Sequence, residues 1–201
     1  MCNEPPLRMP LNDTGSWGKD PIEQYQIRHY NNGLQYAKRR RHAVDIGAHV
    51  GIFTRRFARD FERVTAIEPV NHELLRQNTE HLNNVNIYPF GADRTNGVSY
   101  IHNPVDANGS GWWELTDRET DKTVSIVTVD SLRLREVDYI KVDTQARERE
   151  VLEGAQETIE LCKPIIHVET KDQQLLQWIE YYFDYKWQSK YIKDHILLPV
   201  K

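Results

Sequence analysis

The segment DIGAHVG (45–51) combines small residues with one carboxylate at the end of a short hydrophobic run. Glycine and alanine let a backbone turn approach a ligand closely, and glycine also accepts a positive φ. A turn of this kind at the start of a helix is typical of nucleotide sites. We therefore predict a cofactor-binding turn here, with an ordinary strand–helix turn as the alternative. Its predicted cofactor contacts are Gly47, Ala48, His49 and Gly51.

The acidic residue of this segment bears on which nucleotide is bound. The dinucleotide fingerprint G-x-G-x-x-G places a pyrophosphate at a helix N-terminus. In this chain His49 stands at the central glycine, and Asp45 precedes the first glycine by two residues. A carboxylate there would repel a pyrophosphate but attract the amino group of a methionine moiety. The motif therefore favours S-adenosylmethionine over a dinucleotide, with Asp45 as a further cofactor contact.

Acidic residues also follow the next two hydrophobic runs. Glu68 lies at the end of RVTAIEP (63–69), where a carboxylate can accept both ribose hydroxyls. Asp93 follows the third run, where an acid can meet the adenine amino group, and Ala92 belongs to the same turn. We predict cofactor contacts for all three residues. A solvated acid at a strand end is the alternative for Glu68, and a simple turn is the alternative for Asp93.

Two further carboxylates are candidates for the chemistry. Asp143 ends VDYIKVD (137–143), and Glu169 ends PIIHVE (164–169). Ligands of open α/β sheets bind at the carboxyl ends of the strands. We predict Asp143 as a base or orienting carboxylate and Glu169 as a group that binds or deprotonates a hydroxyl. A helix cap and a solvated strand end are the respective alternatives. No third ligand accompanies them, so we predict no metal.

These side chains require a framework that brings them to one edge. Hydrophobic runs predict strands over 43–48, 63–69, 85–92, 123–130, 137–143 and 164–169, and amphipathic segments predict helices over 21–40, 52–61, 71–82, 147–161 and 173–182. Strands that alternate with helices form parallel sheets. Two final apolar segments without a helix between them predict an antiparallel edge hairpin (185–188 and 195–200). We divide the chain into an N-terminal arm and helix (1–42) and one cofactor-binding domain (43–201).

The segment 94–122 interrupts this alternation. It is polar, and it carries Trp112 and Trp113 after a Gly-Ser-Gly turn. Long insertions in compact domains are often functional, so we expect a substrate lid here. A sugar could stack on the two rings, whereas a hydrophobic plug that holds the loop is the structural alternative.

The chain resembles the FkbM-type methyltransferases over roughly residues 43–169. The resemblance rests on VDIGAHVG, AIEP, VTVDSL and, above all, VDYIKVDTQARERE followed by VLEGA and PIIHVE. Ala146 stands where the family usually has glycine. The resemblance implies a Rossmann-like class I methyltransferase fold, with a mostly parallel seven-stranded sheet flanked by helices. It also implies S-adenosylmethionine as cofactor and methyl transfer, often to a hydroxyl of a sugar or natural product. Some members of the family are encoded in viral genomes.

The composition of the chain bears on which classes of partner are expected. The chain has 201 residues, a formal net charge of −4 and two cysteines. Proteins that wrap nucleic acid usually carry a basic surplus, so we expect no nucleic-acid partner. Neither a signal peptide nor a stretch of about 20 apolar residues occurs, so we expect a soluble, cytoplasmic protein without a membrane partner. Two cysteines are too few for a disulfide framework.

We therefore expect a methyltransferase that modifies a hydroxyl on a sugar, glycan or small metabolite. A nucleic-acid or protein methyltransferase is one alternative, although the chain lacks the Asn/Asp-Pro-Pro-Tyr/Phe motif of enzymes that methylate amino groups of bases. A non-catalytic Rossmann-like binding module is the other, since Ala146 departs from the family pattern. The carboxylates Asp45 and Glu68 favour a working cofactor site. The sequence leaves the acceptor and self-association open.

Overall fold

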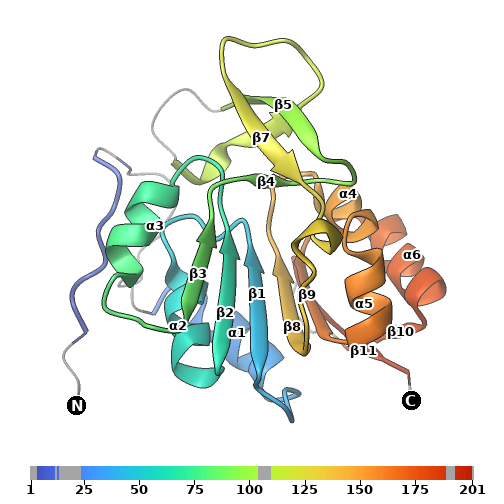
Figure 1. Ribbon diagram of the computed structural model, residues 1–201. Helices are drawn as coiled ribbons and strands as arrows, with labels where there is room; N and C mark the ends of the chain where they lie inside the picture. The colour runs from blue at the N-terminus through green and yellow to red at the C-terminus, as the bar shows by residue number, and fades with distance from the viewer. Residues whose placement is uncertain (1–3, 12, 14–23, 104–109, 189–192, 201) are drawn as a thin grey trace.

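A seven-stranded sheet forms the centre of the molecule. The computed structural model describes residues 4–11, 13, 24–103, 110–188 and 193–200. The strand order is β10-β11-β9-β8-β1-β2-β3 (Figure 1). The strands are β1 (His42–Ile46), β2 (Arg63–Ile67), β3 (Val85–Tyr88), β8 (Val137–Val142), β9 (Ile165–Glu169), β10 (Tyr185–Trp187) and β11 (Asp194–Pro199). Within the described part of this sheet, the two pairings of β11 are antiparallel and the others are parallel. The predicted mostly parallel sheet with an antiparallel edge hairpin is confirmed.

Helices cover both faces of this sheet because the buried strand residues alternate between two apolar clusters. Val44 and Ile46 belong to the apolar cluster that includes Ile159. Ala43 belongs to the other cluster, together with Phe53 and Phe57. The helices are α1 (Ile27–Leu34), α2 (Ile52–Asp60), α3 (His72–Thr79), α4 (Glu148–Glu153), α5 (Gln156–Cys162) and α6 (Gln173–Phe183). The result is a three-layer sandwich, as expected for α/β alternation.

A second, four-stranded sheet of order β4-β7-β5-β6 lies above the carboxyl ends of the parallel strands (Figure 1). Its strands are β4 (Gly91–Ala92), β5 (Gly97–His102), β6 (Glu114–Thr116) and β7 (Thr123–Val127), with the short 3-10 helices η1 (Ser110–Trp112) and η2 (Asp130–Leu132) nearby. The single strand predicted over 85–92 is wrong. It divides into β3 and β4 around Pro89, which has no N–H to continue a ladder.

The helix predicted over 147–161 is also wrong as one element, because it breaks between α4 and α5. A Cβ atom on Gly154 would lie 2.1 Å from the carbonyl oxygen of Asp93, so this position packs directly on a neighbouring backbone. The Gly154 carbonyl accepts the Asp130 N–H at 2.9 Å instead of continuing the helix. The Asp130 carboxylate in turn accepts the N–H groups of Glu157 and Thr158 and caps α5.

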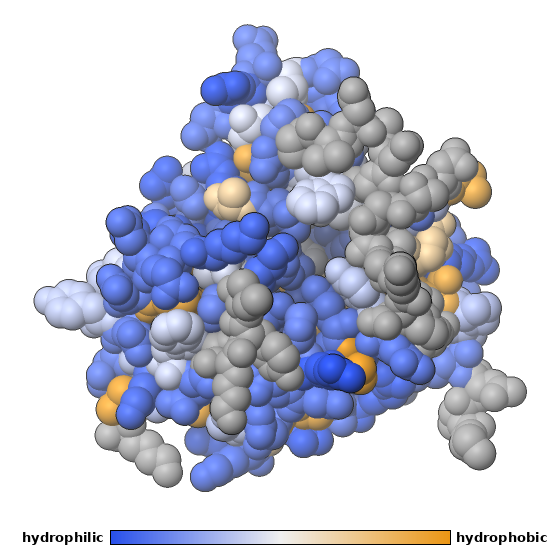
Figure 2. Space-filling model, turned by 180° about the vertical axis from the view of Figure 1, so that it is seen from behind, coloured by the Kyte–Doolittle hydropathy of each residue, from blue (hydrophilic) through white to orange (hydrophobic). Residues whose placement is uncertain are grey.

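The described part of the N-terminal region packs on the same body. Tyr30 of α1 is 3% exposed and lies against the rings of Phe53 and Phe57. The Arg8 backbone pairs with the Asn78 side chain. Among the described residues no helix is long and apolar enough to cross a membrane. The face shown in Figure 2 is mostly hydrophilic, with small separate hydrophobic areas.

Candidate functional site

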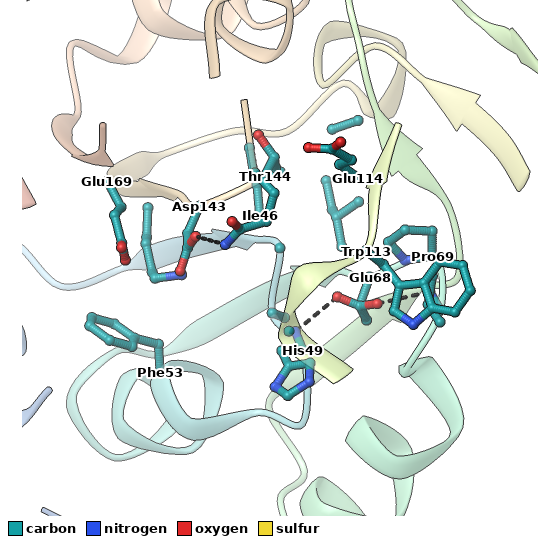
Figure 3. Close-up of a pocket in the computed structure, with 18 of the residues that line it drawn as sticks. Ile46, His49, Phe53, Glu68, Pro69, Trp113, Glu114, Asp143, Thr144 and Glu169 are labelled. Carbon is teal, nitrogen blue, oxygen red and sulfur yellow. Dashed lines mark hydrogen bonds and ion pairs between the residues drawn. The ribbon is translucent and has the colours of Figure 1, made fainter. Parts of the chain in front are cut away.

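A cavity of about 290 Å³ opens at the carboxyl edge of the central sheet. The turn after β1, the ends of β2, β8 and β9, and the second sheet contribute to its wall. Figure 3 shows Asp143 and Glu169 on one side of this cavity and Glu68, His49 and Trp113 on the other. This edge is where ligands of open α/β sheets bind.

The turn after β1 has the backbone that the sequence predicts. Gly47, His49 and Gly51 all have positive φ, of 75°, 52° and 96°. A Cβ atom on Gly47 would lie 1.8 Å from the carbonyl oxygen of Asp143, so glycine lets the turns after β1 and β8 touch. A Cβ atom on Gly51 would lie 2.7 Å from Leu75, so this residue serves the packing of α2 on α3. Gly47, Ala48 and His49 line the cavity, whereas Gly51 is not among its lining residues.

Glu68 lies on the cavity wall next to this turn. One carboxylate oxygen accepts the His49 N–H at 2.9 Å, and the other accepts those of Val70 and Asn71 at 2.8 Å each. A carboxylate offers about four acceptor sites, so these bonds hold its orientation without exhausting it. Backbone donors therefore fix Glu68 at the position that the sequence predicts for a ribose contact.

Asp45 does not reach the cavity. Its side chain is 0% exposed, accepts the Thr54 hydroxyl at 2.6 Å, and lies 3.6 Å from the Lys141 ammonium. Burial raises the pKa of Asp45 above its usual range. The predicted direct contact between Asp45 and a methionine amino group does not fit this placement, because β1 points the side chain into the sheet–helix interface.

Of the two predicted adenine contacts, one lines the cavity and the other does not. Ala92 lines the cavity, but Asp93 is buried outside its lining and accepts the Arg94 N–H at 2.7 Å. Arg147 lies 4.0 Å from the Asp93 carboxylate, and a Cβ atom on Gly154 would meet the Asp93 carbonyl. This geometry favours the turn role for Asp93 that the sequence left open.

Lys141 and Asp143 form an ion pair at the end of β8. Residues two apart on a strand share a face, and the Lys141 Nζ lies 3.3 Å from Asp143 Oδ2. The Gln145 amide donates to the other Asp143 oxygen at 3.3 Å. Burial opposes the charge of Lys141, but Asp143, Asp45 and Glu169 together raise its pKa well above the usual range. Lys141 is therefore a fixed cation on the cavity wall.

Glu169 occupies the neighbouring strand end. Burial, followed by the charges of Asp143 and Asp194, raises the pKa of Glu169 to about 7. The Gln26 amide donates to it at 3.4 Å, and Tyr25 lines the same part of the cavity. Burial and the charge of Glu169 raise the pKa of Tyr25 to about 12. The structure thus brings together Asp143 and Glu169, as predicted, and adds Tyr25 and Gln26, which no sequence motif signalled.

The segment predicted as a lid contributes one wall. Trp112, Trp113 and Glu114 line the cavity from η1 and β6. The Lys122 ammonium lies 4.5 Å from the centre of the Trp113 ring. Ser110, which begins η1, shares a hydrogen bond of 2.7 Å with the His49 side chain. The two tryptophans therefore line the candidate site and do not lie in a remote loop.

The turn after β8 has a left-handed backbone at the position where the family usually has glycine. Gln145 and Ala146 both have positive φ, of 52° and 73°. The buried Glu148 carboxylate accepts the N–H groups of Thr144 and Ala146 at 3.2 and 3.1 Å. These bonds stabilise a conformation that is costly for alanine. Within the described residues no three His, Cys, Asp or Glu side chains gather in a way that could hold a metal ion.

The comparisons with known proteins agree with this geometry. The sequence model of the methyltransferase FkbM domain matches residues 45–191. The crystal structure of methyltransferase FkbM from Methylobacillus flagellatus is similar, with a TM-score of 0.61, 18% identity, and coverage of 89% of this chain and 48% of that one. This chain therefore spans about half the length of that protein. No curated protein matches the sequence significantly.

Two further structures share the architecture. An rRNA methylase from Streptococcus thermophilus has a TM-score of 0.52 and 11% identity over 92% of this chain and 100% of that one. Precorrin-6y C5,15-methyltransferase from Geobacter metallireducens has a TM-score of 0.52 and 11% identity over 90% and 91%. At these identities the similarities show the fold alone, and that fold is the Rossmann-like class I methyltransferase fold.

Proposed function

This chain belongs to the FkbM methyltransferase family, and we propose that it transfers the methyl group of S-adenosylmethionine to a hydroxyl of a sugar, glycan or small metabolite. The observation that carries this proposal is the order of side chains along the cavity. Glu68, the turn after β1, Asp143 and Glu169 line it, together with Ala92. The first four lie at the ends of β2, β1, β8 and β9, which are neighbours in that order in the sheet.

The residues at the β2 side fit the nucleoside. Gly91 and Ala92 are small, and Ile67 and Ile101 give this part of the wall an apolar surface for a flat base. Three of the roughly four acceptor sites of Glu68 are taken by backbone N–H groups, which leaves one for a ribose hydroxyl. The methionine part would then extend over Gly47 and His49 toward β8.

The residues at the β9 side fit a hydroxyl acceptor. When bound, S-adenosylmethionine supplies an electrophilic methyl group on its sulfonium sulfur. Glu169 would hold the acceptor hydroxyl and take its proton, since a pKa of about 7 leaves a large basic fraction near neutral pH. The protein's main contribution is to align oxygen, methyl carbon and sulfur. The new O–CH₃ bond forms as the S–CH₃ bond breaks.

The first test is calorimetric titration with S-adenosylmethionine and S-adenosylhomocysteine. We expect micromolar binding, weakened about 10- to 100-fold in Glu68→Gln, because a charged acceptor for ribose is lost. Glu73→Gln is the matched control, since Glu73 is an exposed acid on α3. Absence of binding at millimolar cofactor would contradict the proposal.

The second step is transfer of a labelled methyl group to acceptors of three classes. We expect labelling of hydroxyl-bearing glycosides or metabolites rather than RNA or protein. Labelling of RNA or protein alone would contradict the proposed acceptor class and would assign the chain to macromolecular methyl transfer. Cofactor binding without any transfer across the three classes would favour a non-catalytic module.

A further inference from the structure

Asp45, Lys141 and His167 form a polar row across the interior of the sheet. The strand register places Asp45 opposite Lys141 and Lys141 opposite His167. Lys141 is only 5% exposed, yet it lines the cavity. A buried cation that reaches a ligand cavity is costly unless it is paired, so its position requires an explanation.

The partners of Lys141 leave one direction open to a ligand. A lysine ammonium has three N–H donors. Asp143 lies at 3.3 Å and Asp45 at 3.6 Å, and the Phe53 ring centre lies 4.9 Å away. Among the described residues only Asp143 lies within hydrogen-bond distance of the ammonium, whereas Asp45 is an ion-pair partner, so Lys141 keeps donors for a group in the cavity.

We infer that the Lys141–Asp143 ion pair recognises the amino-acid end of the cofactor, with Lys141 at the α-carboxylate and Asp143 at the α-ammonium. This assignment rests on the proposed use of S-adenosylmethionine. In it Asp45 never touches the ligand and acts as a positioning residue that holds Lys141. Asp45 thus keeps a role in the cofactor site, but through a second side chain.

The topology supports the assignment. If Glu68 at the end of β2 binds ribose, the methionine part crosses β1 and arrives at β8, the next strand in the sheet. Lys141 and Asp143 are the charged residues that β8 places on the cavity wall. An ion pair complements a zwitterion, because each charge meets its opposite and the net charge of the site is unchanged.

The test compares three ligands by calorimetry. They are S-adenosylhomocysteine, its analogue without the α-carboxylate, and 5′-deoxy-5′-methylthioadenosine, which lacks the whole amino-acid group. The wild type should bind S-adenosylhomocysteine about 10- to 100-fold more tightly than the decarboxylated analogue. The double variant Asp45→Asn/Lys141→Met removes both buried charges together. It should lose this preference while retaining its affinity for methylthioadenosine, which also reports an intact nucleoside site.

Lys193→Met is the matched control, because Lys193 also lines the cavity but lies next to β11. It should keep the wild-type preference. Equal binding of S-adenosylhomocysteine and the decarboxylated analogue to the wild type would overturn the inference, whether or not any variant folds. Retention of the preference in the double variant would overturn it as well. Failure of the wild type to bind S-adenosylhomocysteine would instead contradict the proposed function.

Discussion

At the residue scale, environment separates carboxylates that look alike in the sequence. Asp45 is buried and paired with Lys141, whereas Glu68 is held by backbone N–H groups. Glu169 lines the cavity, and burial together with nearby like charges raises its pKa to about 7. A general base needs a pKa near the working pH. The structure therefore favours Glu169 for proton transfer over its acidic neighbours.

Glu169→Gln should change both activity and the pH dependence of stability. The rate of methyl transfer should rise with pH through about 7 in the wild type. In the variant this rate should fall about 10²- to 10⁴-fold and should no longer depend on pH in that range.

The same substitution should change the pH dependence of stability. The folded-state pKa of Glu169 is raised, so the stabilisation by protonated Glu169 is full below about 4.5 and is lost as the pH rises through about 7. The variant should thus gain relative stability, on the order of 1–3 kcal/mol, over that window. Urea denaturation between pH 4 and 8 measures it, and parallel pH curves for both proteins would contradict the raised pKa.

Ala146→Gly should stabilise the protein. Ala146 has a φ of 73°, where alanine is strained and glycine is not. We expect a gain of about 0.5–1 kcal/mol in the free energy of unfolding, measured by urea denaturation. Ala155→Gly is the control, because Ala155 has a negative φ of −112° and the same change should destabilise there. A loss of stability in Ala146→Gly would show that the turn relies on the alanine methyl group.

Much of the site could be predicted because it follows strand ends. The positions of Glu68, Asp143 and Glu169 need only the rule that parallel strands end at one edge. Asp45 illustrates the limit, because the direction of a side chain within a strand depends on which helix covers that face. Tyr25 and Gln26 illustrate another limit, since a contact between residue 26 and residue 169 leaves no local pattern.

At the element scale, the turns after β1 and β8 meet through the backbone. Gly47 approaches the Asp143 carbonyl so closely that no side chain fits between the two turns. One junction therefore positions both the cofactor turn and the carboxylate at the end of β8. A change at this glycine should affect both parts of the site together.

Gly47→Ala should destabilise the protein and abolish cofactor binding. The new Cβ would lie 1.8 Å from backbone oxygen, and φ is +75°, so both sterics and conformation oppose it. We expect a loss of about 3 kcal/mol or more in the free energy of unfolding. Gly97→Ala is the control, since nothing lies within 4 Å of its Cβ position, and it should stay within about 0.5 kcal/mol. Comparable losses of stability in both variants would contradict the role of Gly47 in joining the turns after β1 and β8.

The fold was predictable where patterns are local and periodic. The strands at β1, β2, β8 and β9 follow from their hydrophobic runs, and so does the edge hairpin. The strand predicted over 123–130 exists as β7, but its place in a separate second sheet was not predictable. The reason is that β5 pairs with β6 and β7 across intervening turns, and the strands are only partly buried. The break at Gly154 was missed because its cause is the distant backbone of Asp93.

At the scale of the whole molecule, the family domain and the packed body differ in extent. The family model begins at residue 45, but α1 lies before it and supplies Tyr30 to the apolar cluster around Phe57. The Tyr30 hydroxyl donates to Asp60 at 2.5 Å, and Arg56 donates to the Tyr25 carbonyl at 2.6 Å. The N-terminal region thus joins α2 through both apolar and polar contacts.

A fragment of residues 42–201 should therefore be much less stable than the full chain. Removing α1 exposes Phe53 and Phe57 and leaves the buried Arg56 without its carbonyl partner. Loss of a large buried aromatic side chain alone costs about 3–5 kcal/mol, which is a substantial part of the stability of a typical domain. Thermal unfolding with a hydrophobic dye should show a lower, broader transition for the fragment. Tyr30→Phe is the control, since it keeps the ring and should cost only about 1 kcal/mol. A fragment that unfolds like the full chain would instead make residues 1–41 dispensable for stability, and Tyr25 and Gln26 would then serve only to complete the cavity wall.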